Sequence, residues 1–92
     1  MGADLRISEI LDCQYENEIR FKRITTIHNW DVIEKLLDKG RKNWCLEGEC
    51  GAEFELLGDT LLEFANEIKK YDKNFDDTKI DIDEWYRCSL SY

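Results

Sequence analysis

The chain has 92 residues, 42% of them hydrophobic and 12% aromatic, which is enough for one folded domain over residues 1–92 but not for two cores. No apolar run could span a bilayer, and the first ten residues lack a secretory signal, so the sequence predicts a cytoplasmic protein with reduced cysteines. The formal net charge is −8, and residues 47–92 carry all of this excess, with thirteen acidic and five basic residues. A field of this sign repels nucleic acid and anionic lipid and attracts basic proteins.

The first part of the chain predicts a β-hairpin. Apolar residues favour alternate positions from Cys13 to Phe21, which is the period of a half-buried strand. Glu16-Asn17 interrupts this pattern and can turn a hairpin whose preceding strand runs from Leu5 to Leu11. A short helix fits the preceding stretch nearly as well, so the sequence leaves residues 4–12 as either strand or helix. The side chains expected on the buried face are Cys13, Tyr15, Ile19 and Phe21.

A helix is predicted between Asn29 and Gly40. Asn29 is a favourable N-cap, Asp31 suits the positive end of the helix dipole, and Gly40 is a typical C-terminal stop. The stripe expected to be buried consists of Trp30, Ile33, Leu36 and Leu37.

A second hairpin is predicted between the two helices, and the hydrophobic pattern selects its register. A two-residue loop, Glu47-Gly48, would place Trp44 and Leu46 on the same face as several glutamates. A three-residue loop, Glu47-Gly48-Glu49, pairs Leu46 with Cys50 instead. Because a shift of one residue moves every side chain to the opposite face, we expect the three-residue loop. One face then carries Trp44, Leu46, Cys50, Ala52, Phe54 and Leu56.

The next helix is predicted to begin at Thr60. Thr60 and Glu63 have the spacing of a capping box, in which each side chain accepts a hydrogen bond from the other residue's backbone. A linking loop is expected from Lys73 to Thr78. The expected apolar face of the helix consists of Leu61, Phe64, Ala65, Ile68 and Tyr71.

The clearest predicted strand runs from Ile80 to Tyr92, where side chains alternate over thirteen residues. Trp85 falls on its polar face together with Asp81 and Asp83. The predicted order is therefore roughly β-β-α-β-β-α-β. Two helices packed on one antiparallel sheet make a small α+β domain.

The cysteines and the single histidine do not predict a metal site or an enzyme. Cys45 and Cys50 have a spacing seen in zinc knuckles, but the preferred register places them on opposite faces of the hairpin. His28 lies beside the helix cap, and nothing in the sequence supports pairing it with a cysteine. The glycines do not cluster into a phosphate-binding loop. We expect no cofactor and no catalytic residue.

The candidate site is acidic. One group of glutamates is expected at the tip and outer face of the second hairpin, and a second group of acids near the last strand surrounds Trp85. A large aromatic side chain among acids is typical of an interface with a basic partner. The alternative is that Trp85 packs beneath a helix. The candidate partner-binding residues are Glu47, Glu49, Glu53, Glu55, Asp76, Asp77, Asp81, Asp83, Glu84 and Trp85.

These features predict a non-enzymatic inhibitor or decoy that blocks the nucleic-acid-binding groove of a basic protein, such as a nuclease or a nucleic-acid-binding complex. Phage anti-defence proteins such as anti-CRISPRs, DNA mimics and nuclease immunity proteins have this charge profile. The amino-acid bias toward Ile, Lys, Asn, Tyr and Phe is that of an AT-rich genome, as in many low-GC bacteria and their phages. The alternative is a regulatory interaction module or homodimer that uses the C-terminal strand as an edge. A structural zinc site or a cysteine-dependent enzyme is a more distant alternative.

Overall fold

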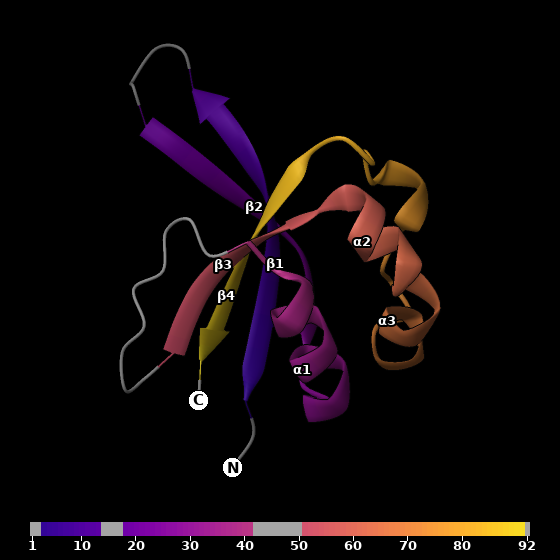
Figure 1. Ribbon diagram of the computed structural model, residues 1–92. Coiled ribbons are helices and arrows are strands. Elements are labelled where there is room, and N and C mark those ends of the chain that lie inside the picture. Colours follow the sequence, from indigo (N-terminus) through magenta and orange to yellow (C-terminus); the bar gives the residue numbers. More distant parts are fainter. Residues whose placement is uncertain (1–2, 14–17, 42–50, 92) are drawn as a thin grey trace.

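The computed structural model describes residues 3–13, 18–41 and 51–91. Its elements are β1 (Asp4–Cys13), β2 (Glu18–Ile27), α1 (Trp30–Lys39), β3 (Gly51–Leu57), α2 (Gly58–Glu63), α3 (Ala65–Tyr71), the 3₁₀ helix η1 (Asp77–Lys79) and β4 (Trp85–Ser91). The described strands form one antiparallel sheet in the order β2-β1-β4-β3, and the helices lie together on one side of it (Figure 1). The predicted α+β fold class is confirmed, with the described elements in the order β-β-α-β-α-α-β.

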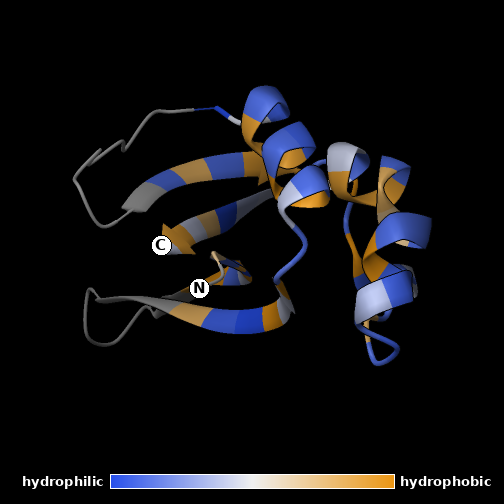
Figure 2. Cartoon of the chain, turned by 90° about the horizontal axis from the view of Figure 1, so that it is seen from below, coloured by the Kyte–Doolittle hydropathy of each residue, from blue (hydrophilic) through white to orange (hydrophobic). Residues whose placement is uncertain are grey.

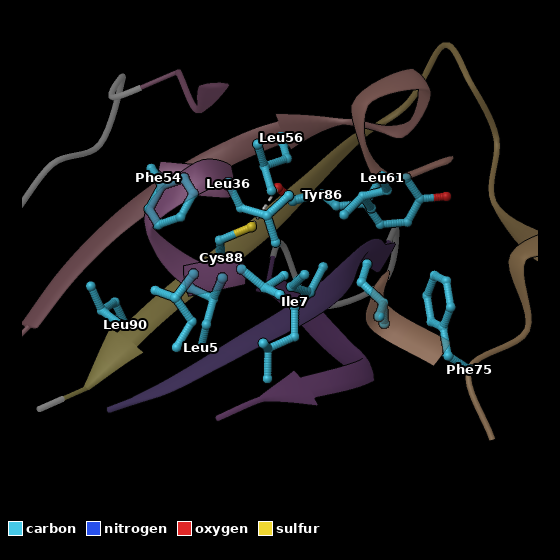
Figure 3. Packing of buried hydrophobic residues seen from close by; sticks show 14 of the residues in the cluster. Leu5, Ile7, Leu36, Phe54, Leu56, Leu61, Phe75, Tyr86, Cys88 and Leu90 are labelled. Atoms are coloured by element: carbon cyan, nitrogen blue, oxygen red, sulfur yellow. Dashed lines mark hydrogen bonds between the residues drawn. The ribbon is translucent and has the colours of Figure 1, made fainter. Parts of the chain in front are cut away.

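The hydrophobic core lies between the helices and one face of the sheet. Figure 2 shows hydrophobic and hydrophilic residues alternating along the strands, and Figure 3 shows the inward-pointing side chains meeting Leu36 and Leu61. Fully burying one such side chain contributes about 1.5–3 kcal/mol. The core residues are Leu5, Ile7, Ile27, Val32, Ile33, Leu36, Phe54, Leu56, Leu61, Ala65, Ile68, Phe75, Tyr86, Cys88 and Leu90.

The first element is a strand, which decides between the two possibilities left by the sequence. β1 pairs with β2 from Leu5 opposite Ile27 to Cys13 opposite Glu18. The predicted hairpin is therefore present, although Glu16-Asn17 lies in residues 14–17, outside the described residues.

A β-bulge in β2 changes the sheet face on which the side chains in the first half of that strand lie. Ile7 opposes Thr25, but the next residue, Ser8, opposes Arg23, so β2 contains one additional residue at this point. Phe21 consequently points away from the helices and is 39% exposed. The prediction that Phe21 lies on the buried face is wrong, because period-two counting is valid only along a strand without a bulge. The side chains of the other three residues of this pattern lie outside the described part: Cys13, Tyr15 and Ile19.

Helix α1 has the predicted limits. The Asn29 side chain accepts a hydrogen bond from the Val32 backbone N–H at 3.2 Å, and the Gly40 N–H donates to the Leu37 carbonyl. Trp30 was expected in the buried stripe but is 45% exposed. The buried residues of α1 are Val32, Ile33 and Leu36, and Leu37 is partly buried against the core.

The second helical segment begins two residues before the predicted Thr60. The backbone N–H groups of Gly58 and Asp59 donate to the carbonyls of Glu84 and Ile82, at 2.8 and 3.2 Å. These distant carbonyls satisfy N–H groups of the first helical turn, so Thr60 lies inside α2 and the predicted capping box is wrong. Phe64 then separates α2 from α3. Of the predicted apolar face, Leu61, Ala65 and Ile68 are buried, Phe64 is half-buried and Tyr71 is exposed.

The last strand is shorter than predicted. β4 begins at Trp85, whereas Asp81 to Glu84 form a tight turn closed by a hydrogen bond from the Glu84 N–H to the Asp81 carbonyl. The Asp81 N–H donates to the Tyr86 hydroxyl at 3.0 Å, which holds the turn against the end of the strand. The alternation is confirmed from Tyr86 onward. The predicted strand is wrong over residues 80–84, because the turn makes backbone contacts with α2 instead of a sheet neighbour.

The loop and the first strand of the predicted central hairpin lie in residues 42–50, outside the described residues. Arg41 and Glu55 nevertheless form an antiparallel bridge, with N···O distances of 2.7 and 2.8 Å. The choice between the two-residue and the three-residue loop concerns residues outside the described part of the chain. Phe54 and Leu56 lie on the buried face, as predicted.

Candidate protein-binding surfaces

The sheet face opposite the helices carries ordered rows of side chains. An apolar row at one end of the sheet contains Phe21 opposite Ile10 and Leu57 opposite Trp85. The neighbouring row crosses all the described strands and reaches residue 41. It consists of Arg23, Ser8, Arg87, Glu55 and Arg41. In the described part of the chain no helix covers this open face (Figure 1).

Two arginines of the second row, Arg41 and Arg87, each contact an aromatic ring and a glutamate. The guanidinium carbon of Arg87 lies 4.1 Å from the centre of the Phe21 ring, and the same side chain forms an ion pair with Glu53. Arg41 lies 3.7 Å above the Trp85 ring and 3.4 Å from a carboxylate oxygen of Glu55. Each arginine therefore neutralises a glutamate and covers an aromatic side chain.

This arrangement changes the role of the glutamates predicted on the outer face of the second hairpin. Glu53 and Glu55 do lie on that face, but the Glu55 side chain is only 5% exposed and both carboxylates have an arginine partner. They present little free negative charge to a partner. Glu47 and Glu49, the other two residues of this group, lie outside the described residues.

Trp85 is half-buried on the open face of the sheet, not beneath a helix. Its neighbours there are Arg41 and Leu57. Asp81 and Asp83 do not share its strand face as predicted, because they belong to the turn that precedes β4. The acidic surroundings expected for Trp85 are thus replaced by an arginine.

One group of free carboxylates lies around the start of α2 and the turn before β4. We use the name acidic turn for the exposed residues at the start of α2 and in the turn before β4. The Asp83 N–H donates to the Asp81 side chain at 2.9 Å, and the backbone of both segments is joined by hydrogen bonds. Within the described residues none of its carboxylates has an ion-pair partner, and Ile82 at its centre is 51% exposed. The acidic turn consists of Asp59, Asp81, Ile82, Asp83 and Glu84.

Asp76 and Asp77, the other predicted acids of this region, have local partners. Hydrogen bonds from the Thr78 hydroxyl and backbone N–H lower the pKa of Asp76. Asp77 forms an ion pair with Lys69 at 2.9 Å. The predicted second cluster is therefore divided, and only its members in the turn before β4 join the acidic turn.

The described cysteine and histidine belong to separate environments. Cys88 is fully buried in the core, and desolvation there raises the pKa of its thiol well above the ordinary value. His28 is exposed just beyond the end of β2, with Nδ1 2.6 Å from an Asp4 oxygen. Cys45, Cys50 and the Cys13 side chain lie outside the described part, and no group of three metal-ligating side chains occurs within it.

Comparison of the chain with protein-family models, curated proteins and solved structures found no match. Within the described residues, none of the helices has the length and apolar character needed to cross a membrane. The surfaces themselves are therefore the basis for a functional proposal.

The arginine and aromatic rows were not predicted from the sequence. Arg23, Arg41 and Arg87 are far apart in the chain, and only strand pairing brings them into one row. The residue type could have indicated which basic side chains lie on this face. Every arginine whose side chain is described lies on or beside the open face, whereas Lys22 lies on the face that carries the helices.

Proposed function

We propose that this protein is a non-enzymatic binding module that docks onto a basic surface of another protein through the acidic turn. The observation that carries this proposal is the set of exposed carboxylates around Ile82, none of which has a cation partner in the described part of the chain. Charged groups around a central apolar side chain suit an interface in which charge steers association and the apolar contact holds the complex.

The acidic turn is also held in shape before any partner binds. Backbone hydrogen bonds fix it to the first turn of α2, and the Tyr86 hydroxyl fixes it to β4. A surface that is ordered in advance loses less conformational entropy on binding. This rigidity supports a docking role over that of a solvated loop.

Inhibition of a nucleic-acid-binding protein is the form of this function that fits the charge best. A partner groove that binds phosphates would present the arginine and lysine side chains that these carboxylates complement. Because Glu53 and Glu55 are already paired with arginines, the decoy surface would be the compact acidic turn rather than a row along β3. The regulatory homodimer through the C-terminal strand has less support, since β4 lies between β1 and β3 and is not an edge.

The test compares two variants with equal charge. One variant, D81N/D83N/E84Q, removes three carboxylates from the acidic turn, and the matched control, D31N/E34Q/D38N, removes three exposed carboxylates from α1. Both are used to capture proteins from lysate at low and high salt, beside the wild type. We expect a basic protein that the wild type and the control retain at low salt, and that the turn variant loses by about tenfold or more.

Two results would contradict this proposal. If both variants lose the partner equally, net charge and not the acidic turn determines binding. If the turn variant retains the partner at wild-type level, the docking surface lies elsewhere. Circular dichroism of each variant shows whether the fold is intact.

A further inference from the structure

The open face of the sheet carries a second, oppositely charged feature, away from the acidic turn. Arg6 on β1 and Arg23 on β2 are both exposed, and neither has an ion-pair partner among the described residues. Two unneutralised arginines on neighbouring strands are unexpected in a chain with a net charge of −8. This face therefore differs in charge from the rest of the molecule.

Strand pairing places two hydroxyl groups between these arginines. Arg6 opposes Thr26, and Arg23 opposes Ser8, so the four side chains form a block on the open face with the arginines at diagonal positions. Diagonal neighbours in a sheet are about 7–8 Å apart, which two arginine side chains can bridge to reach one small anion. The β-bulge between the two pairs is what turns Arg23 toward this face.

Two shielded polar groups, one in the block and one beside it, have no hydrogen-bond partner among the described residues. The Thr26 hydroxyl is shielded from solvent and has no hydrogen-bond partner among the described residues. The Nε of Arg87, on the other side of Ser8, is in the same state. Buried polar groups of this kind are rare in folded proteins, since most are hydrogen-bonded.

A surface hollow covers three residues of the block, Arg6, Arg23 and Thr26, and extends over the edge of β2. The acids that line it, Asp4 and Asp72, are each engaged by another group, with His28 at 2.6 Å from Asp4 and the Thr25 hydroxyl donating to Asp72 at 2.7 Å. Both carboxylates are thus hydrogen-bonded within the protein, whereas the guanidinium groups of Arg6 and Arg23 have no ion-pair partner among the described residues. Its lining includes Arg6, Arg23, Thr26 and Asn74.

We infer that this block binds a phosphate group, either as the free ion or as a terminal phosphate ester. Two arginines balance the two negative charges of a phosphate, and arginine guanidinium groups with hydroxyls supply the donors that its oxygens accept. A single carboxylate would leave one arginine charge unbalanced. The inference is independent of the acidic turn, because none of the residues involved belongs to it.

The test measures binding of inorganic phosphate, phenyl phosphate and acetate at constant ionic strength, through amide chemical shifts of the full chain. We expect saturable shifts around the block with phosphate, with a dissociation constant on the order of 1 mM, and much weaker binding of acetate. Tighter binding of phenyl phosphate than of inorganic phosphate would identify a terminal ester as the ligand. Preference for inorganic phosphate would identify the free ion.

Variants separate the block from general charge. R6Q and R23Q should each weaken phosphate binding by about tenfold or more, and T26V by about threefold or more. The matched control is K22Q, which removes a positive charge next to Arg23 but on the other face of the sheet, and should change binding little. R6K and R23K keep the charge without the planar guanidinium and should weaken binding by several-fold.

The inference is wrong if phosphate gives no saturable shifts, if acetate binds as well as phosphate, or if K22Q weakens binding as much as R23Q. Should either glutamine variant fail to fold, the lysine and T26V variants still decide the outcome. Because K22Q and all block variants leave the acidic turn unchanged, failure here would not bear on docking to a basic protein.

Discussion

Arg41 and Arg87 each lie between a glutamate and an aromatic ring, and they determine where negative charge is available. Without them, Glu53 and Glu55 would be free carboxylates on a sheet face. With them, each glutamate on that face of β3 is paired with an arginine. The arginines of the face that have no ion pair within the described residues are Arg6 and Arg23. The charge of a residue type thus says little about a surface until its partners are known.

Cys88 gives a prediction at the same scale. Its thiol is buried and its pKa is raised by desolvation, so the reactive thiolate is scarce in the native protein. We expect Cys88 to resist iodoacetamide at pH 8 in the folded protein and to react fully in guanidinium chloride. Peptide mapping by mass spectrometry after each treatment measures this. Equal labelling of Cys88 in both states would show that the core opens on the time scale of the reaction.

At the scale of elements, the contact between the start of α2 and the turn before β4 organises the proposed docking surface. Gly58 lies so close to this turn that an added Cβ would be 1.8 Å from the Asp81 carbonyl oxygen. Backbone atoms cannot yield as a flexible side chain can, so only glycine fits there without a shift of one segment. This approach also allows the hydrogen bond from the Gly58 N–H to Glu84.

The substitution G58A should therefore lower the free energy of unfolding by about 1–3 kcal/mol, because the two segments must separate. The matched control is N66A in α3, at an exposed position, which should change stability by less than about 0.5 kcal/mol. Chemical denaturation of both variants measures the difference. A fully stable G58A protein would mean that the segments can part without loss, and that the acidic turn is not held rigid by this contact.

At the scale of the whole molecule, the burial of two ionisable groups makes the free energy of unfolding depend on pH in the alkaline range. Desolvation is the main cause that raises the pKa of Tyr86 from its ordinary value of 10.0, and burial acts on Cys88 in the same direction from 9.0. Both groups are neutral when protonated, so the unfolded chain releases these protons at lower pH than the folded one. Their contribution to stability is complete below the unfolded pKa values and is lost as pH rises above them.

We therefore expect the free energy of unfolding to fall as pH rises past about 9–10. The variant Y86F removes one of the two groups and should show a shallower fall. Its stability at neutral pH should drop by about 1 kcal/mol, because the Asp81 N–H loses its acceptor. Denaturation curves between pH 7 and pH 11 measure both effects, and identical slopes for the two proteins would contradict the assignment to Tyr86.

The elements that the sequence predicted well are those with local causes. Asn29 and Gly40 limit α1 because a cap acts through hydrogen bonds within one turn. The alternation of Tyr86, Cys88 and Leu90 marks the buried face of β4 because a strand without a bulge keeps period two. Fold class follows from such local patterns together, and it is confirmed.

What only the tertiary structure decided depends on contacts between distant segments. The bulge in β2 moved Phe21 to the open face, and carbonyls of the turn before β4 replaced the Thr60 cap at the start of α2. By itself, the sequence determined the α+β fold class and a charge excess confined to residues 47–92. The structure decided which carboxylates remain free and which arginines share a row, because strand pairing joins residues that no local periodicity relates.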